Sequence, residues 1–211
     1  MKKRIITLFT ISAIAVSVIA CKSKTKEDNI AQVETVAKAS EASEKYTADV
    51  TASSITWTGY KPTGSHTGTV KLKQGALTLK NGHIESGKFS IDMASIKDSE
   101  SNARLEKHLK SADFFDVENH PNATFEITEV SKNEGETMIS GNLTVKNITN
   151  KVAFPVSITN NNNSVTLTSD TFKIDRSKWE IKFKSKSFFT NLGDKFINDD
   201  IDLKISVTAT K

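Results

Sequence analysis

The sequence predicts an all-β fold, an antiparallel barrel or sandwich of about eight strands. Apolar residues alternate with polar ones in short runs, most strictly from Ile201 to Ala209, and this period of two is typical of half-buried strands. Turn signals separate the runs; Asn81-Gly82 is the clearest, because both residues tolerate positive φ. An immunoglobulin-like sandwich would suggest paired cysteines, and the chain has a single cysteine. These observations favour a barrel.

The predicted strands follow one another at short spacing along the chain. Their apolar rows are Ile55 and Trp57, Val70 to Leu79, Ile84 to Met93, Phe125 and Ile127, Met138 to Val145, Val152 to Ile158, Val165 and Leu167, Phe172 and Ile174, and Ile201 to Ala209. Pro155 faces away from the row around it, which suggests an edge or bulged position. An eight-stranded barrel is wide enough to be filled by side chains or to hold one small ligand, and periodicity does not decide between the two.

One segment, around residues 99–115, interrupts the strands and predicts a short helical insertion. Leu105 and Leu109 lie four residues apart and so share one helix face. Asp98 and Ser99 are candidate N-caps, because their side-chain oxygens can accept from the unpaired amides of a first turn. This pattern predicts a helical plug or lid that packs on the sheet.

The same segment carries motifs of a known family. Its signature residues are Arg104, His108, Leu109, Ser111, Asp113, Phe114, Phe115, Asp116, Val117, Pro121, Thr124 and Phe125. Further motifs follow in order: Gly141 to Val145, Phe172 to Ser177, and Leu192 to Asp194. Over roughly Ser53 to Lys211 the chain resembles the YceI-like family, departing from it at Trp179-Glu180 and around Tyr60 to Thr69. The resemblance implies a lipocalin-like barrel that binds a polyisoprenoid or similar amphipathic lipid in its interior.

The start of the chain predicts export and lipidation. Residues 1–20 have a basic start, an apolar run and a small-residue end, the layout of a signal peptide. Val18 to Cys21 resembles the lipobox of bacterial lipoproteins, in which the cysteine is lipidated. Residues 21–50 are rich in Lys, Glu, Ala, Ser and Thr and predict a flexible tether, which leaves 51–211 as the lipid-binding barrel. The expected location is the cell envelope, with the protein anchored to a membrane and facing the periplasm or the cell surface.

The alternating rows and the resemblance together give candidate site residues. The predicted lipid-binding lining is Trp57, Leu79, Phe89, Ile91, Phe125, Leu143, Phe154, Phe172, Leu203 and Ile205. A candidate head-group site consists of Arg104, His108 and Arg176, which would suit a polyprenyl diphosphate because guanidinium pairs with phosphate oxygens in bidentate geometry. Alternatively, Arg104 pairs with a surface carboxylate and Asp175 orients Arg176 within the fold.

The motifs of common enzymes do not occur in the sequence. The four histidines are scattered without zinc-binding spacing, and there is no nucleophile elbow or dinucleotide fingerprint. Loss of Lys2, Lys3 and Arg4 with the leader would lower the formal charge from +4 to +1, which argues against nucleic-acid binding. We therefore expect a non-enzyme without a metal or cofactor that carries, stores or sequesters an isoprenoid-type lipid. The alternatives are an enzyme or accessory protein for an isoprenoid quinone, and a structural envelope protein with a solid core.

Overall fold

The structure, a computed structural model, describes residues 33–133 and 135–211, all of which belong to one compact unit. Its elements are β1 (Glu44–Lys61), β2 (Gly64–Lys80), β3 (His83–Asp98), α1 (Ala103–Lys110), β4 (Asn122–Asn133), β5 (Glu136–Val145), β6 (Ile148–Asn161), β7 (Ser164–Ser169), β8 (Phe172–Asp175), the 3₁₀ turns η1 (Arg176–Trp179) and η2 (Gly193–Lys195), and β9 (Asp200–Thr210). None of the helices in these ranges has the length and apolarity needed to span a membrane.

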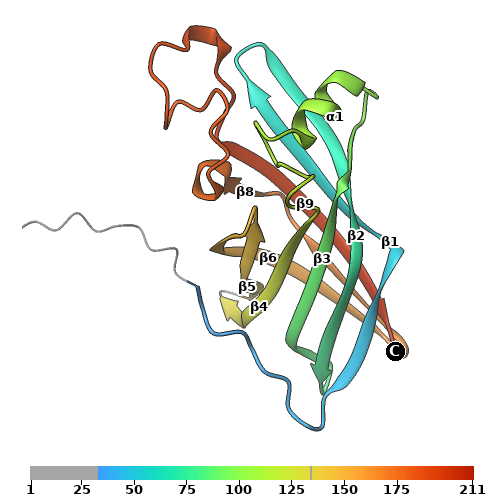
Figure 1. The fold of residues 1–211 in the computed structure, drawn as a ribbon. Helices are drawn as coiled ribbons and strands as arrows, with labels where there is room; N and C mark the ends of the chain where they lie inside the picture. The colour runs from blue at the N-terminus through green and yellow to red at the C-terminus, as the bar shows by residue number, and fades with distance from the viewer. Residues whose placement is uncertain (1–32, 134) are drawn as a thin grey trace, which may run out of the picture. The chain divides into compact units, whose positions relative to one another are not determined.

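The strands form one closed antiparallel barrel (Figure 1). They pair in the order β1-β2-β3-β4-β5-β6-β7-β9, and β9 pairs back to β1. The short strands β7 and β8 both pair with β9, β7 along its second half and β8 along its first. Because the other neighbour of β9 is β1, β7 and β8 are two parts of one interrupted strand. The predicted lipocalin-like barrel of about eight strands is therefore confirmed.

One end of the barrel is filled by side chains. The predicted Asn81-Gly82 turn closes this end with positive φ at both residues, and Asn160, near the end of β6, donates to the carbonyl oxygen of Gly82 at 2.9 Å. Above these turns the interior holds fully or nearly fully buried side chains, namely Tyr46, Leu77, Leu79, Ile84, Val156, Val165 and Ala209. This part is called the solid half below.

The other end carries the predicted helical insertion and the segment 176–199, called the mouth segment (Figure 1). Leu109 of α1 is buried and Leu105 packs against the core, as their spacing predicts. The predicted N-cap is wrong: Asn102 caps the helix, and its Oδ1 accepts from the amide of Leu105 at 3.1 Å. Asp98 instead fixes the corner before the helix by accepting from two later amides through Oδ2.

The barrel begins earlier than the expected boundary at residue 51. Strand β1 starts at Glu44 and continues through an irregularity after Thr47. Asp49 makes this possible, because its Oδ1 accepts from the amides of Thr51 and Ala52 and so satisfies groups that the shifted ladder leaves unpaired. The rest of the expected tether, up to residue 32, lies outside the described residues.

The residues just before β1 lie against the outer surface of the barrel. Asn142 of β5 exchanges two hydrogen bonds with the backbone of Glu34, and the Glu34 carboxylate pairs with Lys151 at 2.6 Å. Ala37 donates its amide to the carbonyl of Ile127 at 3.0 Å. Residues 33–43 therefore form a strap over β4, β5 and β6. Asn142, which belongs to the family-like Gly-Asn-Leu-Thr motif, is one of the residues that fasten it.

Candidate functional site: the barrel cavity and its mouth

The half of the barrel nearest α1 encloses a cavity of about 860 Å³. This volume lies within the range of roughly 300–1,000 Å³ that is usual for small-molecule sites. Most of the lining is aliphatic or aromatic and comes from every strand of the barrel; beyond the predicted residues it includes Val70, Leu72, Met93, Ile127, Ile139, Val152, Leu167, Ile174 and Val207. Such a lining excludes water without offering many polar partners, so it suits an apolar guest.

Nine of the ten predicted lining residues line this cavity: Trp57, Phe89, Ile91, Phe125, Leu143, Phe154, Phe172, Leu203 and Ile205. Leu79 does not. It pairs with Ile84 beside the closing turn and is only 2% exposed within the solid half. Alternation correctly predicted that Leu79 points inward, but it carries no information on height along the barrel axis.

Three phenylalanines form a row across the interior. The rings of Phe125 and Phe154 lie 5.6 Å apart, and those of Phe154 and Phe172 stack with centroids 4.2 Å apart. Gly141 makes room for the first ring, because a Cβ at this position would lie 2.4 Å from Cζ of Phe125. These contacts give one wall of the cavity a continuous aromatic surface.

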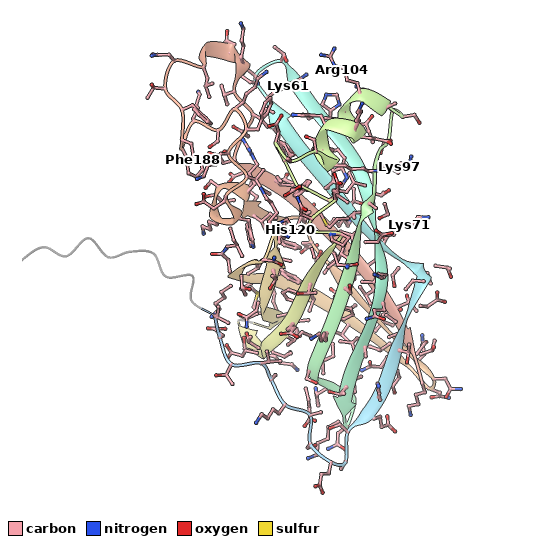
Figure 2. The ribbon with its side chains drawn as sticks, viewed as in Figure 1. Lys61, Lys71, Lys97, Arg104, His120 and Phe188 are labelled. Atoms are coloured by element: carbon pink, nitrogen blue, oxygen red, sulfur yellow. The ribbon has the colours of Figure 1, made fainter. Side chains whose placement is uncertain are left out.

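Basic side chains gather where the cavity opens. Arg104 and His108 of α1 both line it, as their shared helix face predicts, and Figure 2 shows Arg104 and Lys61 at the same end of the barrel. Lys184 and Lys195 of the mouth segment also line it. These five residues are called the mouth cluster. Its three lysines were not predicted from the sequence, because Lys61 at the end of β1 and the mouth segment come together only in the folded barrel.

Two of the mouth residues have distinct surroundings. Arg104 is exposed and makes no ion pair with any residue in the ranges 33–133 and 135–211, so the alternative of a surface carboxylate partner is not observed. His108 is partly buried and meets the edges of Phe114 and Phe183, at centroid distances of 5.9 and 4.5 Å. Arg104 is therefore available to a ligand, while His108 forms part of an aromatic rim.

Arg176, the third predicted head-group residue, is engaged by the protein itself. Its side chain is 1% exposed and donates to the carbonyl oxygens of Asn198, Ile181 and Ile197 at 3.0, 2.6 and 3.0 Å. Its Nη2 also lies 3.1 Å from Asp199. Burial lowers the pKa of Arg176, and the charge of Asp199 counteracts this. Arg176 thus holds the mouth segment together.

The alternative role expected for Asp175, orienting Arg176, is filled mainly by other groups. Asp175 caps η1 through a hydrogen bond of 2.9 Å from the amide of Ser177. Its charge only adds to that of Asp199 in opposing the effect of burial on the pKa of Arg176. The Asp-Arg motif therefore starts and secures the mouth segment. Arg176 is among the residues that line the cavity, but each of its three guanidinium nitrogens donates to a backbone carbonyl of the protein itself.

One group of side chains in the described part of the chain could offer three ligand atoms to a metal ion. His66, Asp98 and Glu100 place these atoms within 4.8 Å of one another. Nδ1 of His66 and Oδ1 of Asp98 lie 3.6 Å apart and have no hydrogen-bond partner, while Oδ2 of Asp98 serves the helix corner. The proximity of these two atoms fits a His66–Asp98 pair as well as it fits a metal site. The expectation that the protein needs no metal therefore stays a prediction.

The chain is similar to known proteins both in sequence and in fold. The chain is 30% identical over 148 residues to a UPF0312 protein of Serratia proteamaculans, covering 68% of this chain and 73% of that protein. Protein YceI of Escherichia coli O157:H7 is 29% identical over the same shares. Among solved structures, Burkholderia cenocepacia BcnA matches with a TM-score of 0.64 at 20% identity, over 77% of this chain and 99% of that one.

A second solved structure has the same fold. It is described as a polyisoprenoid binding domain from Saccharophagus degradans and matches with a TM-score of 0.59 at 11% identity, over 78% of this chain and 97% of that one. The family model for the YceI-like domain matches residues 46–209, which span the barrel from β1 to β9. The chain therefore belongs to the YceI-like domain family, as its motifs had suggested.

Proposed function

We propose that this protein binds an amphipathic lipid with an isoprenoid-like chain, holding the chain in the cavity and the polar end at the mouth cluster. The observation that carries the proposal is a closed barrel with an apolar cavity of about 860 Å³ and cationic residues at its opening. The description of the Saccharophagus degradans neighbour as polyisoprenoid-binding supports this choice of ligand class.

The hydrophobic effect provides enough free energy for such binding. Each buried CH₂ group contributes about 0.8 kcal/mol, so about ten of them give a gross gain of roughly 8 kcal/mol. This matches the free energy of micromolar affinity, before the cost of ordering the chain. The ligand therefore needs few specific polar contacts, and the lining selects it mainly by size and apolarity.

The mouth cluster favours a ligand whose polar end is anionic. Arg104 is exposed beside Lys61, Lys184 and Lys195, while Asp194 is the one carboxylate among the described lining residues. A guanidinium with nearby ammonium groups suits a phosphate or diphosphate, because several charge-assisted hydrogen bonds can form at once. The same donors would bind the ring oxygens of an isoprenoid quinone more weakly.

The proposed setting is the cell envelope. A leader over residues 1–20 would deliver the protein to the membrane, and lipidation at Cys21 would keep it there; both lie outside the described residues. Two acyl chains give stable anchoring, whereas one binds reversibly. An anchored barrel could carry, store or sequester a membrane lipid without catalysing its conversion.

Extraction of the purified protein with organic solvent, followed by mass spectrometry, tests the proposal. We expect a prenyl lipid in a defined ratio to protein. The variant Ile205→Trp, which fills the cavity from a half-buried lining position, should stay folded and yield much less lipid. The control Val50→Trp changes an exposed residue and should yield as much as the parent. Equal yields from all three proteins, or no binding of added prenyl lipid to the parent, would contradict an interior site.

A further inference from the structure

An exposed pair of aromatic rings lies on the mouth segment. Phe188 is 40% exposed and Phe189 is 49% exposed. Every other Phe, Trp and Tyr within residues 33–133 and 135–211 is buried or half-buried. Figure 2 shows Phe188 at the same end of the barrel as Lys61 and Arg104. Neighbouring large apolar side chains exposed on one surface are typical of contact sites rather than of solvated loops.

Hydrogen bonds hold the segment in the shape that exposes these rings. The hydroxyl groups of Ser185 and Ser187 both donate to Oδ2 of Asp199, at 2.8 and 2.7 Å. The amide of Phe189 donates to the carbonyl of Ser185 at 3.0 Å, which closes the turn before the rings. Asp199 in turn pairs with the buried Arg176. These hydrogen bonds therefore fix the backbone of the segment that carries the two exposed rings.

Three lysines precede the aromatic pair in the mouth segment. Lys182, Lys184 and Lys186 alternate along the segment just before it and are all exposed. Nζ of Lys182 lies 4.8 Å from the ring centre of Phe188. Glu180 is the one carboxylate within residues 176–189, and it pairs with Lys182. The surface therefore combines exposed aromatic rings with a net positive charge.

The same segment forms part of the cavity opening. Phe183 and Lys184, which precede the aromatic pair in the mouth segment, line the cavity, and so do Lys195 and Phe196, which follow it later in the same segment. A surface that contacts Phe188 and Phe189 therefore also contacts the segment that frames the opening. This continuity connects the exposed surface with the proposed ligand path.

We propose that residues 182–189 dock on the surface of an anionic bilayer, so that lipid can pass between the bilayer and the cavity. Aromatic rings partition into the membrane interface, and each lysine near an anionic surface adds electrostatic attraction. The inference rests on the proposed lipid binding and adds the surface from which the ligand is taken or to which it is delivered. A protein partner would use the rings without requiring anionic lipid.

Depth-dependent quenching tests the docking in the full chain. Phe188→Trp is mixed with vesicles that contain brominated phosphatidylcholine and about 30 mol% phosphatidylglycerol, a level chosen to give a strongly negative surface. We expect clearly more quenching than in the parent, and a loss of this difference in neutral vesicles or high salt. The matched control Val50→Trp carries an exposed residue of β1 that lies away from the mouth segment. Any N-terminal anchor is common to both variants, so equal quenching at the two positions would overturn the proposal.

Lipid loading separates this inference from the proposed function. In Phe188→Ser/Phe189→Ser, transfer of a fluorescent prenyl lipid from anionic vesicles should slow at least tenfold, while affinity for the same lipid in detergent solution stays within twofold. Unchanged transfer would overturn the docking surface and leave lipid binding intact. Absence of binding in detergent by the parent would instead refute the proposed function. A variant that transfers slowly from neutral and anionic vesicles alike would contradict recognition of anionic lipid.

Discussion

Phe154 and Phe172 stack with their ring planes 10° apart, and both rings line the cavity. Phe172 belongs to β8, the second part of the interrupted strand, so the stack connects β8 at the mouth end of the barrel to β6, which is not its hydrogen-bonded neighbour. The solid half lies towards the opposite end of the barrel, which the Asn81-Gly82 turn closes. The barrel therefore has two energetically different halves, one packed for stability and one open to a ligand.

Alanine substitutions in the two halves should have different effects. Leu79→Ala in the solid half should lower the free energy of unfolding by about 2–5 kcal/mol and leave lipid affinity unchanged. Phe154→Ala should also destabilise the fold, by about 3–5 kcal/mol, because the ring is only 3% exposed and packs against Phe125 and Phe172. It should weaken lipid binding. Urea unfolding of the lipid-free protein and lipid titration measure the two effects, and a large stability loss with unchanged affinity for Phe154→Ala would contradict a cavity at this position.

The network of Asp202 should make stability depend on pH in acid. Asp202 accepts from the hydroxyl of Tyr60 at 2.8 Å and pairs with Lys173. Lys173 mainly, with Tyr60, lowers the pKa of Asp202 below its usual value. The unfolded chain therefore takes up this proton first as the pH falls, so the stability from this group is present above about pH 4 and is lost below it.

Urea unfolding between pH 7 and pH 3 measures this contribution. Asp202→Asn should be less stable than the parent at pH 7, and the gap should narrow as the pH falls below about 4. Asp170→Asn, a substitution at an exposed aspartate, serves as the control and should follow the parent throughout. A gap that stays constant with pH would show that Asp202 stabilises the fold without its charge.

Lipidation at Cys21 remains a prediction from sequence. Cells fed an alkyne fatty acid should label the protein, and Cys21→Ser should abolish the label because the thioether cannot form. Ser23→Ala, two residues further on, should keep it. Two acyl chains would make the labelled protein resist extraction by salt or alkali. Label that persists in Cys21→Ser would show that the acyl groups are attached to a residue other than Cys21.

The sequence predicted the inward and outward faces of the strands well because they depend on local periodicity. Pro155 is a partial success: β7 ends opposite Val156, so Pro155 lies just beyond that ladder, but it still pairs with Met138 of β5 without a bulge. Leu79 shows the limit, since depth along the barrel is set by register and by where the turns close. The early start of β1 was missed because it depends on the hydrogen bonds of Asp49.

Arg176 shows why the head-group site was only partly predictable. The family-like motif marked Arg176 as important. The partners of its side chain, however, are three backbone carbonyls and Asp199, which is distant only in sequence. Backbone carbonyls leave no signature in a sequence. Arg104 and Arg176 are therefore alike as sequence features and opposite in environment, one exposed at the opening and the other buried within the mouth segment.

This difference predicts opposite phenotypes for two equivalent substitutions. Arg176→Gln leaves Asp199 and buried carbonyls without their partner, so the free energy of unfolding should fall by about 3–5 kcal/mol. Affinity for every prenyl ligand should fall with it, since the mouth segment frames the cavity. Arg104→Gln changes an exposed residue without an ion pair in the described ranges, and stability should change by less than about 0.5 kcal/mol.

Ligand comparison then tests the head-group role of Arg104. The parent should bind a prenyl diphosphate more tightly than the matching prenyl alcohol, and added salt should reduce that preference. In Arg104→Gln the preference should fall about tenfold, the value of one charge-assisted hydrogen bond of roughly 1.5 kcal/mol, with affinity for the alcohol unchanged. Lys71→Gln, a charge removal on the outer face of β2 away from the cavity lining, is the matched control and should keep the preference. Equal affinities for both ligands in all of these proteins would mean that the cavity recognises only the apolar chain.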